Sequence, residues 1–503
     1  MTLRRVLIAN RGEIAIRVAR ACREVGIETV AVFSDADAGA PHTRAADRAV
    51  RIGAAPPRES YLKIEAILAA AAETKCDAVH PGYGFLSESA AFARACEAAR
   101  VIFVGPSADT IELMGSKIGA RALMQKAGVP VVPGVTPADQ SDDGVLDAIR
   151  SIGFPALVKA SAGGGGKGMR ALREESQAAE MIAGARREAQ AAFGDGTLYV
   201  ERLVERPRHV EIQVFGDSQG NAVHLFEREC SVQRRHQKVI EESPSVALTP
   251  TLRGRMGDAA VKAARAAKYR NAGTIEFLLE GTGNKACFYF LEMNTRLQVE
   301  HPVTEAVTGV DLVHAQLAVA AGAPLPWTQE TLAQRGHAIE CRVYAEDPAS
   351  GFLPQAGRLL RYREPSGPGI RVDAGVVEGA DVPVMYDPLL AKLTVWGETR
   401  ASAIDRAIAA LRDFPVLGIR SNVSFLIRAL DHREFRAGRI HTGFIEEHLG
   451  DLNRRPDVPK EAAGAALLGS PAPPVSYGAA TGAQRAPVVG DRDPWSMLKG
   501  WGR

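Results

Sequence analysis

Residues 6–33 decide the fold of the amino-terminal region and read VLIANRGEIAIRVARACREVGIETVAVF. The apolar run at 6–9 predicts a short buried strand, and apolar residues at roughly helical spacing over 13–25 predict a helix that ends at Gly26. A second apolar run at 29–33 predicts the next strand. A strand, a helix and a strand in this order form a βαβ unit, so we expect a parallel sheet with helices on its faces.

The same alternation continues along the chain. Gly and Pro residues over 128–137 mark a domain joint, and 154–203 is typical of a small α+β unit. Residues 451–503 are rich in Pro, Gly and Ala and are typical of a linker or flexible extension, in which Trp495 and Trp501 are unusual. Helices are expected at 60–73, 400–412 and 421–430, and further strands at 77–79, 101–104, 209–215, 222–227, 273–279, 287–293, 338–343, 357–363 and 389–396.

Length and composition exclude several classes of protein. At about 100–200 residues per domain, 503 residues predict about three domains. The hydrophobic fraction of 46% and the charged fraction of 24% are those of a globular chain, and a net charge of +2 without a long run of like charge argues against a nucleic-acid partner. The apolar run at 6–9 is too short for a signal peptide or a membrane helix. The six cysteines lack C-x-x-C or zinc spacing, so we expect reduced thiols in a soluble cytoplasmic protein with no membrane partner.

A glycine-rich segment, SAGGGGKGM at 161–169, is the first chemical signal. Its glycines match a dinucleotide-binding pattern, but that pattern requires a following helix, whereas strands are expected on both sides here. A Walker loop also fails, because Met169 stands where Ser or Thr is required. What remains is a hairpin whose N–H groups bind phosphate, with Lys159 and Lys167 adding charge, or a tight solvated turn. Four consecutive glycines cost too much chain entropy for a simple turn, which favours the phosphate loop.

The second signal is the segment LEMNTRLQVEHP at 291–302. Strand periodicity puts Glu292, Asn294 and Arg296 on one face. Carboxylate and amide oxygens beside a cation suit Mg²⁺ bound to a nucleoside triphosphate. The alternative is an edge strand with a polar solvent face. Glu276 argues against it, because this residue lies in the apolar segment TIEFL, where a buried glutamate needs a partner or a metal.

A third cluster, ERECSVQRRHQK at 227–238, is too polar for a core and lacks helical spacing. Its Arg, His and Lys residues suit an anionic substrate, and the alternative is a solvated loop. His209 and His236, taken singly, are more typical of structural histidines.

Together these motifs resemble biotin carboxylase, the ATP-grasp component of the biotin-dependent carboxylases, over roughly residues 3–450. The resemblance rests on long matching segments in the same order. They are IANRGEIA (8–15), HPGYGFLSE (80–88), 159–169, RHVE (208–211), 230–238, 292–302, and CR at 341–342 followed by AEDP at 345–348.

The resemblance implies a multidomain fold of α/β and α+β parts. The expected parts are an amino-terminal parallel βαβ (pre-ATP-grasp) domain at 1–115, an ATP-grasp domain at 116–336 with a mobile glycine-rich lid at about 132–203, a mixed carboxy-terminal domain at 337–449 and a flexible tail at 450–503.

The resemblance also implies site residues. The residues expected in catalysis are Glu300, Arg296, Lys238 and Arg342. Those expected at the metal are Glu276, Glu292 and Asn294. Those expected to bind ATP, bicarbonate or biotin are Lys117, Lys159, Gly163, Gly164, Gly165, Gly166, Met169, Glu201, Leu203, His209, Gln233, His236, Leu278, Gln298, Val299, Tyr83 and Asp387.

In the implied reaction Glu300 deprotonates bicarbonate, while Arg296 and Lys238 hold the anion in line with the γ-phosphate of ATP. Mg²⁺ or Mn²⁺ neutralises charge on the phosphoryl group, and the lid keeps water from carboxyphosphate. Carboxyphosphate then releases CO₂ and phosphate, the phosphate takes the N1 proton of biotin, and Arg342 stabilises the biotin enolate. Tyr83 and Asp387 are expected near the biotin ring.

The expected partners follow from the same resemblance. None of the nine methionines is followed by Lys, so the biotin-bearing Met-Lys-Met segment is absent and the biotin carboxyl carrier protein is expected to be a separate polypeptide. We also expect a homodimer within a larger complex that contains a carboxyltransferase subunit, with Arg20 and Glu24 near the dimer contact. Tyr344 and the DPWS segment at 493–496 look more like the α chains of acyl-CoA carboxylases, which favours the first half-reaction of an acetyl- or propionyl-CoA carboxylase.

Three alternatives stay open. The chain could serve a pyruvate carboxylase, because the acceptor is chosen by the partner transferase. It could be another ATP-grasp ligase, although Arg342 and Tyr83 match a biotin site that such ligases do not need. It could also be a catalytically silent regulatory subunit, although the charged site residues are intact.

Overall fold

The computed structural model describes residues 2–161 and 169–454. The chain divides into two compact units, Met1–Arg454 and Arg455–Arg503, and every described residue belongs to the first. The glycines expected to bind phosphate, 163–166, and residues 455–503 of the expected tail lie outside the described residues. None of the helices that the structure describes combines the length and the hydropathy of a membrane-spanning segment.

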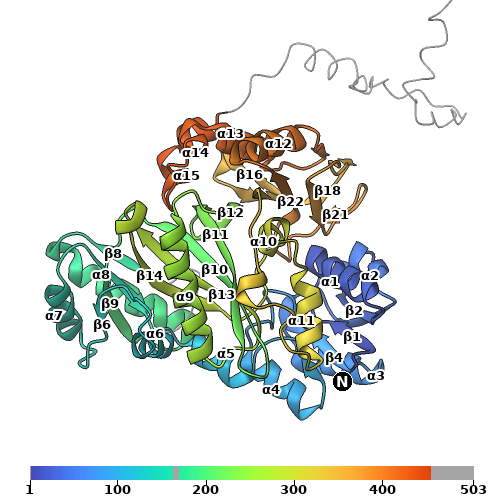
Figure 1. Cartoon of the computed structure of the whole chain (residues 1–503), viewed down its shortest axis with the longest axis horizontal. Coiled ribbons are helices and arrows are strands. Elements are labelled where there is room, and N and C mark those ends of the chain that lie inside the picture. The colour runs from blue at the N-terminus through green and yellow to red at the C-terminus, as the bar shows by residue number, and fades with distance from the viewer. Residues whose placement is uncertain (1, 162–168, 455–503) are drawn as a thin grey trace, which may run out of the picture. The chain divides into compact units, whose positions relative to one another are not determined.

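A five-stranded parallel sheet forms the amino-terminal region (Figure 1), as the βαβ pattern predicts. Its order is β3-β2-β1-β4-β5, with β1 (Arg5–Ile8), β2 (Glu28–Ser34), β3 (Arg48–Gly53), β4 (Ala78–His80) and β5 (Ile102–Phe103). Its helices are α1 (Gly12–Glu24), α2 (Pro41–Ala45), α3 (Ile64–Glu73), α4 (Ala90–Ala98) and α5 (Ala108–Gly115). Sequence periodicity missed β3, because this edge strand exposes Arg48 and Arg51 and carries no apolar run.

A second, four-stranded sheet follows helix α6 (Lys117–Lys126) and has the order β6-β9-β7-β8. Strands β7 and β8 are antiparallel partners, so the predicted strand–loop–strand arrangement around the glycine-rich segment is confirmed. Helices α7 (Asp142–Ile152) and α8 (Ala178–Phe193) pack against this sheet. Its strands are β6 (Gly134–Val135), β7 (Ala156–Ala160), β8 (Arg170–Leu172) and β9 (Leu198–Arg202).

An eight-stranded sheet joins the middle and the carboxy-terminal parts, with the order β14-β13-β10-β11-β12-β15-β22-β20. Strand β12 pairs with β15, so the hydrogen-bonded ladder crosses the domain boundary that was expected at 336/337. Helix α9 (Pro250–Ala266) packs on β10 and β11, α10 (His301–Thr308) on β15 and β22, and α11 (Leu312–Ala320) on β13. The strands are β10 (Arg208–Gly216), β11 (Ala222–Arg234), β12 (Gln237–Ser243), β13 (Asn271–Glu280), β14 (Cys287–Asn294), β15 (His337–Tyr344), β20 (Ile370–Ala374) and β22 (Leu389–Gly397).

The third sequence cluster lies in this sheet, and the interpretation that it is too polar for a core was wrong. Residues 227–233 belong to β11, and Glu227, Arg228 and Glu229 are each at most 1% exposed. Their charges are paired by side chains from neighbouring strands and helices, which local composition does not reveal. Only the turn after β11, at Arg235 and His236, is an exposed loop.

The carboxy-terminal helices are α12 (Arg400–Arg412), α13 (Val423–Asp431), α14 (Arg433–Arg436), α15 (Phe444–Glu447) and α16 (Leu449–Leu452). The first two confirm the predicted helices, whereas α16 extends to Leu452, into the tail that was expected to begin at residue 450. The prediction of a single strand at 357–363 was wrong. This segment forms two short strands, β18 (Gly357–Arg358) and β19 (Arg361–Tyr362), which pair with β21 (Asp381–Val382) and β23 (Val416–Leu417), respectively.

Candidate active site

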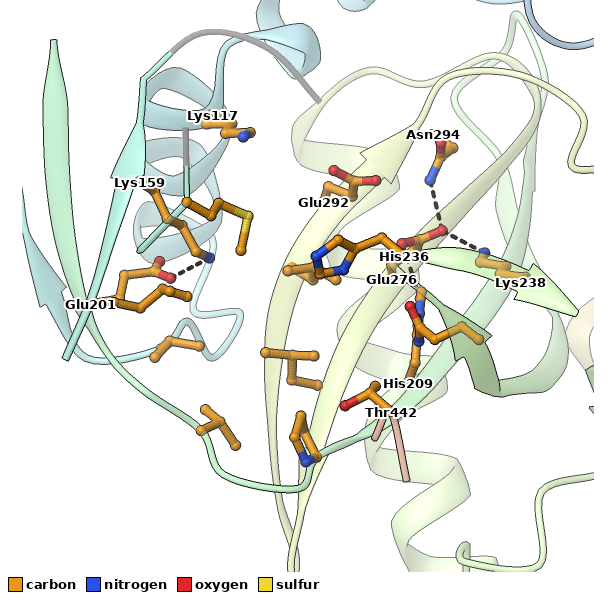
Figure 2. Close-up of a pocket in the computed structure, with 18 of the residues that line it drawn as sticks. Lys117, Lys159, Glu201, His209, His236, Lys238, Glu276, Glu292, Asn294 and Thr442 are labelled. Carbon is orange, nitrogen blue, oxygen red and sulfur yellow. Dashed lines mark hydrogen bonds and ion pairs between the residues drawn. The ribbon is translucent and has the colours of Figure 1, made fainter. Parts of the chain in front are cut away.

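A cavity of about 400 Å³ has walls from the four-stranded sheet and from the eight-stranded sheet (Figure 2). Most of the residues that the sequence predicted for the site line it. They are Lys117, Lys159, Met169, Glu201, Leu203, His209, Gln233, His236, Lys238, Glu276, Leu278, Glu292, Asn294, Arg296, Gln298, Val299 and Arg342.

One part of the cavity wall is apolar. Val132, Leu157, Leu203, Leu278 and Leu291 line it. Flat apolar walls beside a few polar groups suit an aromatic base. The sequence predicted Leu203 and Leu278 and missed the other three, because a single apolar residue in a strand carries no signal for a ligand.

A cationic wall comes from α6 and β7. Lys159 lies 2.5 Å from a Glu201 carboxylate oxygen, and Arg121 lies 2.8 Å from the other. The Lys117 ammonium has no hydrogen bond or ion pair with any residue that the structure describes, and burial together with the neighbouring Lys159 charge lowers its pKa. Figure 2 shows both lysines on the side of the cavity opposite Glu292. An anion such as a phosphate group would supply the partner that Lys117 lacks.

Three carboxylates form a row across the opposite wall. Glu292 of β14 is the register partner of Glu276 of β13, which is the partner of Glu211 of β10. Residues directly opposite share a face of the sheet, and like charges in such pairs repel. The row is therefore stable only where cations or hydrogen-bond donors lie between its members.

Glu276 is fully provided with such partners, as Figure 2 shows. His209 Nε2 lies 3.0 Å from one of its oxygens, and Lys238 Nζ and Asn294 Nδ2 donate to the other at 2.8 and 2.9 Å. Burial opposes ionisation, but Lys238 and His209 outweigh it and hold the pKa of Glu276 well below its usual range. His209 is thus part of the cavity wall and not a purely structural histidine.

Glu292 has no such partner among residues 2–161 and 169–454. Burial, and secondly the charge of Glu276, raise the pKa of Glu292. A divalent cation between Glu292 and Glu276 would relieve this repulsion. Carboxylate oxygens with an amide oxygen nearby are the donors that Mg²⁺ prefers, so these residues and Asn294 fit the expected metal.

Lys238 is the electrostatic centre of the site. Its ammonium lies 2.5 Å from Glu211, 2.8 Å from Glu276 and 2.6 Å from Glu300. The site residues predicted from the sequence do not include Glu211, although the matching RHVE segment contains it. The signal was available: Glu211 lies between apolar residues in a predicted strand, as Glu276 does.

Glu300 is fully buried next to the cavity, between two cations. It contacts Lys238 and accepts a hydrogen bond from Arg342 Nη2 at 2.9 Å, while Arg342 Nε donates to Glu241 at 2.5 Å. Burial favours the neutral acid, but Lys238 and then Arg342 outweigh it and hold the pKa of Glu300 well below its ordinary value. Glu300 is therefore an ionised carboxylate that can accept a proton.

Arg296 follows β14 and reaches the same end of the cavity. It donates to Asn294 Oδ1 at 3.0 Å and to Gln298 Oε1 at 3.1 Å, which orients both amides. Its Nε donates to Glu88 of the amino-terminal region at 2.9 Å. Glu88 ends the matching segment HPGYGFLSE, but the sequence alone did not indicate a role for it.

Besides Glu300, two predicted site residues that the structure describes do not line this cavity, Tyr83 and Asp387. The Tyr83 hydroxyl donates to Glu13, and the Asp387 carboxylate accepts from the Leu389 N–H at 2.9 Å. Both lie close enough to Arg342 for its charge to act on them. Arg342, which lines the cavity, thus lies near both Tyr83 and Asp387.

The arrangement can perform a definite set of chemical tasks. The apolar wall and the lysines suit a nucleotide with its phosphates, and Glu276 with Glu292 suits a divalent cation. Lys238 and Arg296 offer charge to a small anion beside an ionised base, Glu300. These are the parts needed to activate a small oxyanion for phosphoryl transfer.

Three family models match the chain. The model for the amino-terminal domain of biotin carboxylase matches residues 2–111, the ATP-binding domain of the carbamoyl-phosphate synthase L chain matches 116–328, and the carboxy-terminal domain of biotin carboxylase matches 340–447.

Similar proteins come from bacteria, archaea and animals. Biotin carboxylase of Halalkalibacterium halodurans is 50% identical over 89% of this chain and 98% of its own length. A pyruvate carboxylase subunit of Methanothermobacter thermautotrophicus is 50% identical over 88% of this chain and 90% of its own length. The alpha subunit of mouse (Mus musculus) methylcrotonoyl-CoA carboxylase is 49% identical over 93% of this chain, which spans 65% of the mouse protein.

The solved structures agree with these relatives. The biotin carboxylase domain dimer of the Hydrogenobacter thermophilus 2-oxoglutarate carboxylase, in complex with MgADP, ADP and bicarbonate, is 44% identical, with a TM-score of 0.87. The likeness covers 91% of this chain and 100% of that one.

Proposed function

This chain belongs to the biotin carboxylase family of ATP-grasp ligases, and on that premise we propose that it carboxylates biotin, using ATP and bicarbonate as substrates. The observation that carries the proposal is the position of Glu300. It is a buried ionised carboxylate between Lys238 and Arg342, beside a cavity that offers cations to phosphates and an apolar wall to a base.

The proposed phosphate ligands are two lysines whose charges are not fully paired: Lys117 has no ion-pair partner in the described part of the chain, and Lys159 shares Glu201 with Arg121. Lys117 and Lys159 receive the phosphates, and Leu203 and Leu278 contact the base. Glu276 and Glu292, with Asn294 beside them, would hold Mg²⁺ or Mn²⁺, which neutralises charge on the phosphates when bound.

Bicarbonate binds next to the base. Arg296 and Lys238 hold the anion, and Glu300 accepts its proton, so that the oxygen becomes a better nucleophile toward the γ-phosphate. In the present arrangement Lys238 keeps Glu300 weakly basic. An anion that shares the Lys238 charge raises the pKa of Glu300, so the base gains strength only when its substrate is present.

Arg342 links this step to biotin. When Glu300 takes the proton, it becomes neutral and attracts Arg342 less strongly, which leaves more of the guanidinium charge for an oxyanion. Phosphate released from carboxyphosphate takes the N1 proton of biotin, and Arg342 stabilises the resulting enolate. Tyr83 and Asp387 lie close enough to Arg342 to border the biotin ring.

The proposed physiological role is the first half-reaction of an acyl-CoA carboxylase of the acetyl- or propionyl-CoA type, with biotin on a carrier protein supplied in trans and a carboxyltransferase as a further partner. Relatives at 49% and 50% identity serve methylcrotonoyl-CoA and pyruvate carboxylases, so the acceptor is tested by pairing the chain with each class of transferase.

A homodimer in the cytoplasm is part of the same proposal. Within the chain, Arg20 pairs with Asp373 and Glu24 with His314.

The deciding experiment measures ADP release with Mg²⁺, ATP and bicarbonate, with and without free biotin. Stimulation by biotin that disappears without bicarbonate supports the proposal. Turnover indifferent to biotin would favour another ATP-grasp ligase. No turnover, even with a biotinylated carrier, would favour a regulatory subunit.

A further inference from the structure

A fully buried lysine lies outside the machinery described above. Lys392 is in β22 of the eight-stranded sheet and is 0% exposed. Its ammonium donates to the Val299 carbonyl at 2.8 Å and lies 3.1 Å from Glu13 Oε1. Burying an ammonium group costs free energy unless an anion balances its charge and acceptors bind its N–H groups. The Val299 carbonyl and Glu13 supply these partners to Lys392.

The first contact reaches the segment that carries the base. Val299 precedes Glu300, which is the N-cap residue of α10. A hydrogen bond to the Val299 carbonyl fixes the peptide that joins these two residues. The orientation of that peptide sets where the Glu300 side chain begins.

The second contact reaches the amino-terminal region. Glu13 lies in the first turn of α1 and is 5% exposed. Its Oε1 accepts the Tyr83 hydroxyl as well as the Lys392 ammonium, and its Oε2 has no hydrogen-bond partner among the described residues. The Lys392 ammonium lies 6.0 Å from the centroid of the Tyr83 ring. One carboxylate oxygen thus ties Tyr83 to Lys392.

Strand β15 places a second cation directly beside Lys392. Lys392 is the direct register partner of Arg342 in β15. Two cations directly opposite each other repel, so each needs anionic or carbonyl partners in a different direction. Arg342 turns to the Glu300 side chain, and Lys392 turns to the carbonyl of the preceding residue. The two cations therefore hold the same short segment at adjacent points.

We propose that Lys392 is a positioning residue that fixes the Val299–Glu300 peptide and, through Glu13, the Tyr83 hydroxyl, so that the bicarbonate base and the residue at the biotin ring are held in one arrangement. The inference rests on the proposed function. It assigns Lys392 no contact with a substrate.

The test compares Lys392→Met with wild type in the ADP-release assay. The expected result is an increase of about tenfold in the KM values for bicarbonate and for biotin. The KM for ATP should stay within about twofold of wild type, because Lys392 contacts none of the residues proposed to bind the nucleotide, namely Lys117, Lys159, Leu203 and Leu278. A purely structural role would lower the active fraction, and so kcat, and would leave all three KM values unchanged. Lys262→Met, an exposed lysine of α9, is the matched control.

Glu13→Gln separates the two contacts. It weakens the link to Tyr83 and keeps the Val299 hydrogen bond, so only the KM for biotin should rise. If Lys392→Met does not fold, the Glu13→Gln/Lys392→Met double variant replaces it, because it leaves no buried charge from this pair. If neither folds, Glu13→Gln decides alone.

The possible failures are distinguishable. Wild type without bicarbonate-dependent ADP release would overturn the proposed function and the role of Lys392 with it. An active wild type with unchanged bicarbonate and biotin KM values in the folded variants would overturn only the role of Lys392.

Discussion

The Glu88 carboxylate holds Arg296 from across a domain boundary: its Oε2 accepts from Arg296 Nε at 2.9 Å, and its Oε1 accepts from the Thr295 N–H at 3.1 Å. Glu88 lies between β4 and α4 of the amino-terminal region, whereas Arg296 follows β14 of the eight-stranded sheet. The amino-terminal region therefore supplies a side chain that orients the arginine expected to hold bicarbonate.

Glu88→Gln should raise the KM for bicarbonate by about tenfold, because an amide holds the guanidinium less firmly than a carboxylate does. The KM for ATP should change by less than about twofold. Steady-state ADP release at varied bicarbonate measures both values. Glu97→Gln, an exposed residue of α4, is the matched control, and equal bicarbonate KM values in the two variants would contradict the role of Glu88.

Glu300→Gln should lower bicarbonate-dependent turnover by about 10²-fold or more, because the amide cannot accept the proton. Lys238 keeps Glu211 and Glu276 as partners, so the fold and the nucleotide site should persist. Calorimetric titration with ATP measures the second point. A loss of nucleotide affinity beyond about tenfold, or ~1.4 kcal/mol, would show that Glu300 acts in ATP binding instead.

Glu292→Gln should make the metal-free protein more stable and weaken its binding of Mg²⁺. Glu292 repels Glu276 and has no partner in the described part of the chain, so the amide should raise the free energy of unfolding without metal by up to about 1 kcal/mol. The half-saturating Mg²⁺ concentration for ATP turnover should rise by about tenfold or more. Denaturant unfolding and Mg²⁺ titration give the two readouts, with Glu180→Gln on α8 as the control. A less stable variant with normal Mg²⁺ dependence would contradict the assignment.

Glu242 should make stability depend on pH. Burial opposes its ionisation, but hydrogen bonds and charge from His337 and Arg400 lower its pKa from 4.5 to about 2. A carboxyl whose pKa is lower in the folded state stabilises the protein above the unfolded value and loses that contribution as the pH falls toward the folded one. Glu242→Gln should therefore cost about 3 kcal/mol at pH 7, and the difference from wild type should shrink between about pH 4.5 and pH 2.

Denaturant unfolding of wild type and Glu242→Gln across this pH range provides the measurement, with Glu97→Gln as the control for loss of an exposed carboxylate. A difference that stays constant with pH would mean that the variant acts through packing and not through the charge of Glu242.

Sequence periodicity predicted the local elements well where hydrophobicity is regular. The strand–helix–strand unit at 6–33 and the strands on both sides of the glycine-rich segment are confirmed. The edge strand β3 escaped prediction because half of its side chains face solvent. The motifs around Lys238 and Glu292 also indicated residues that the fold brings to one cavity.

The sequence by itself determined the family, the parallel amino-terminal sheet and most of the residues that line the cavity, because each depends on short segments whose pattern is local. Only the tertiary structure decided which charges are buried and what pairs with them. Strand β11 is buried despite its polarity, and Glu88, Glu211 and Lys392 join the site through partners from distant parts of the chain. A charge is stable inside a protein only when opposite charges or hydrogen-bond partners converge on it, and those partners are distant in the sequence until the chain folds.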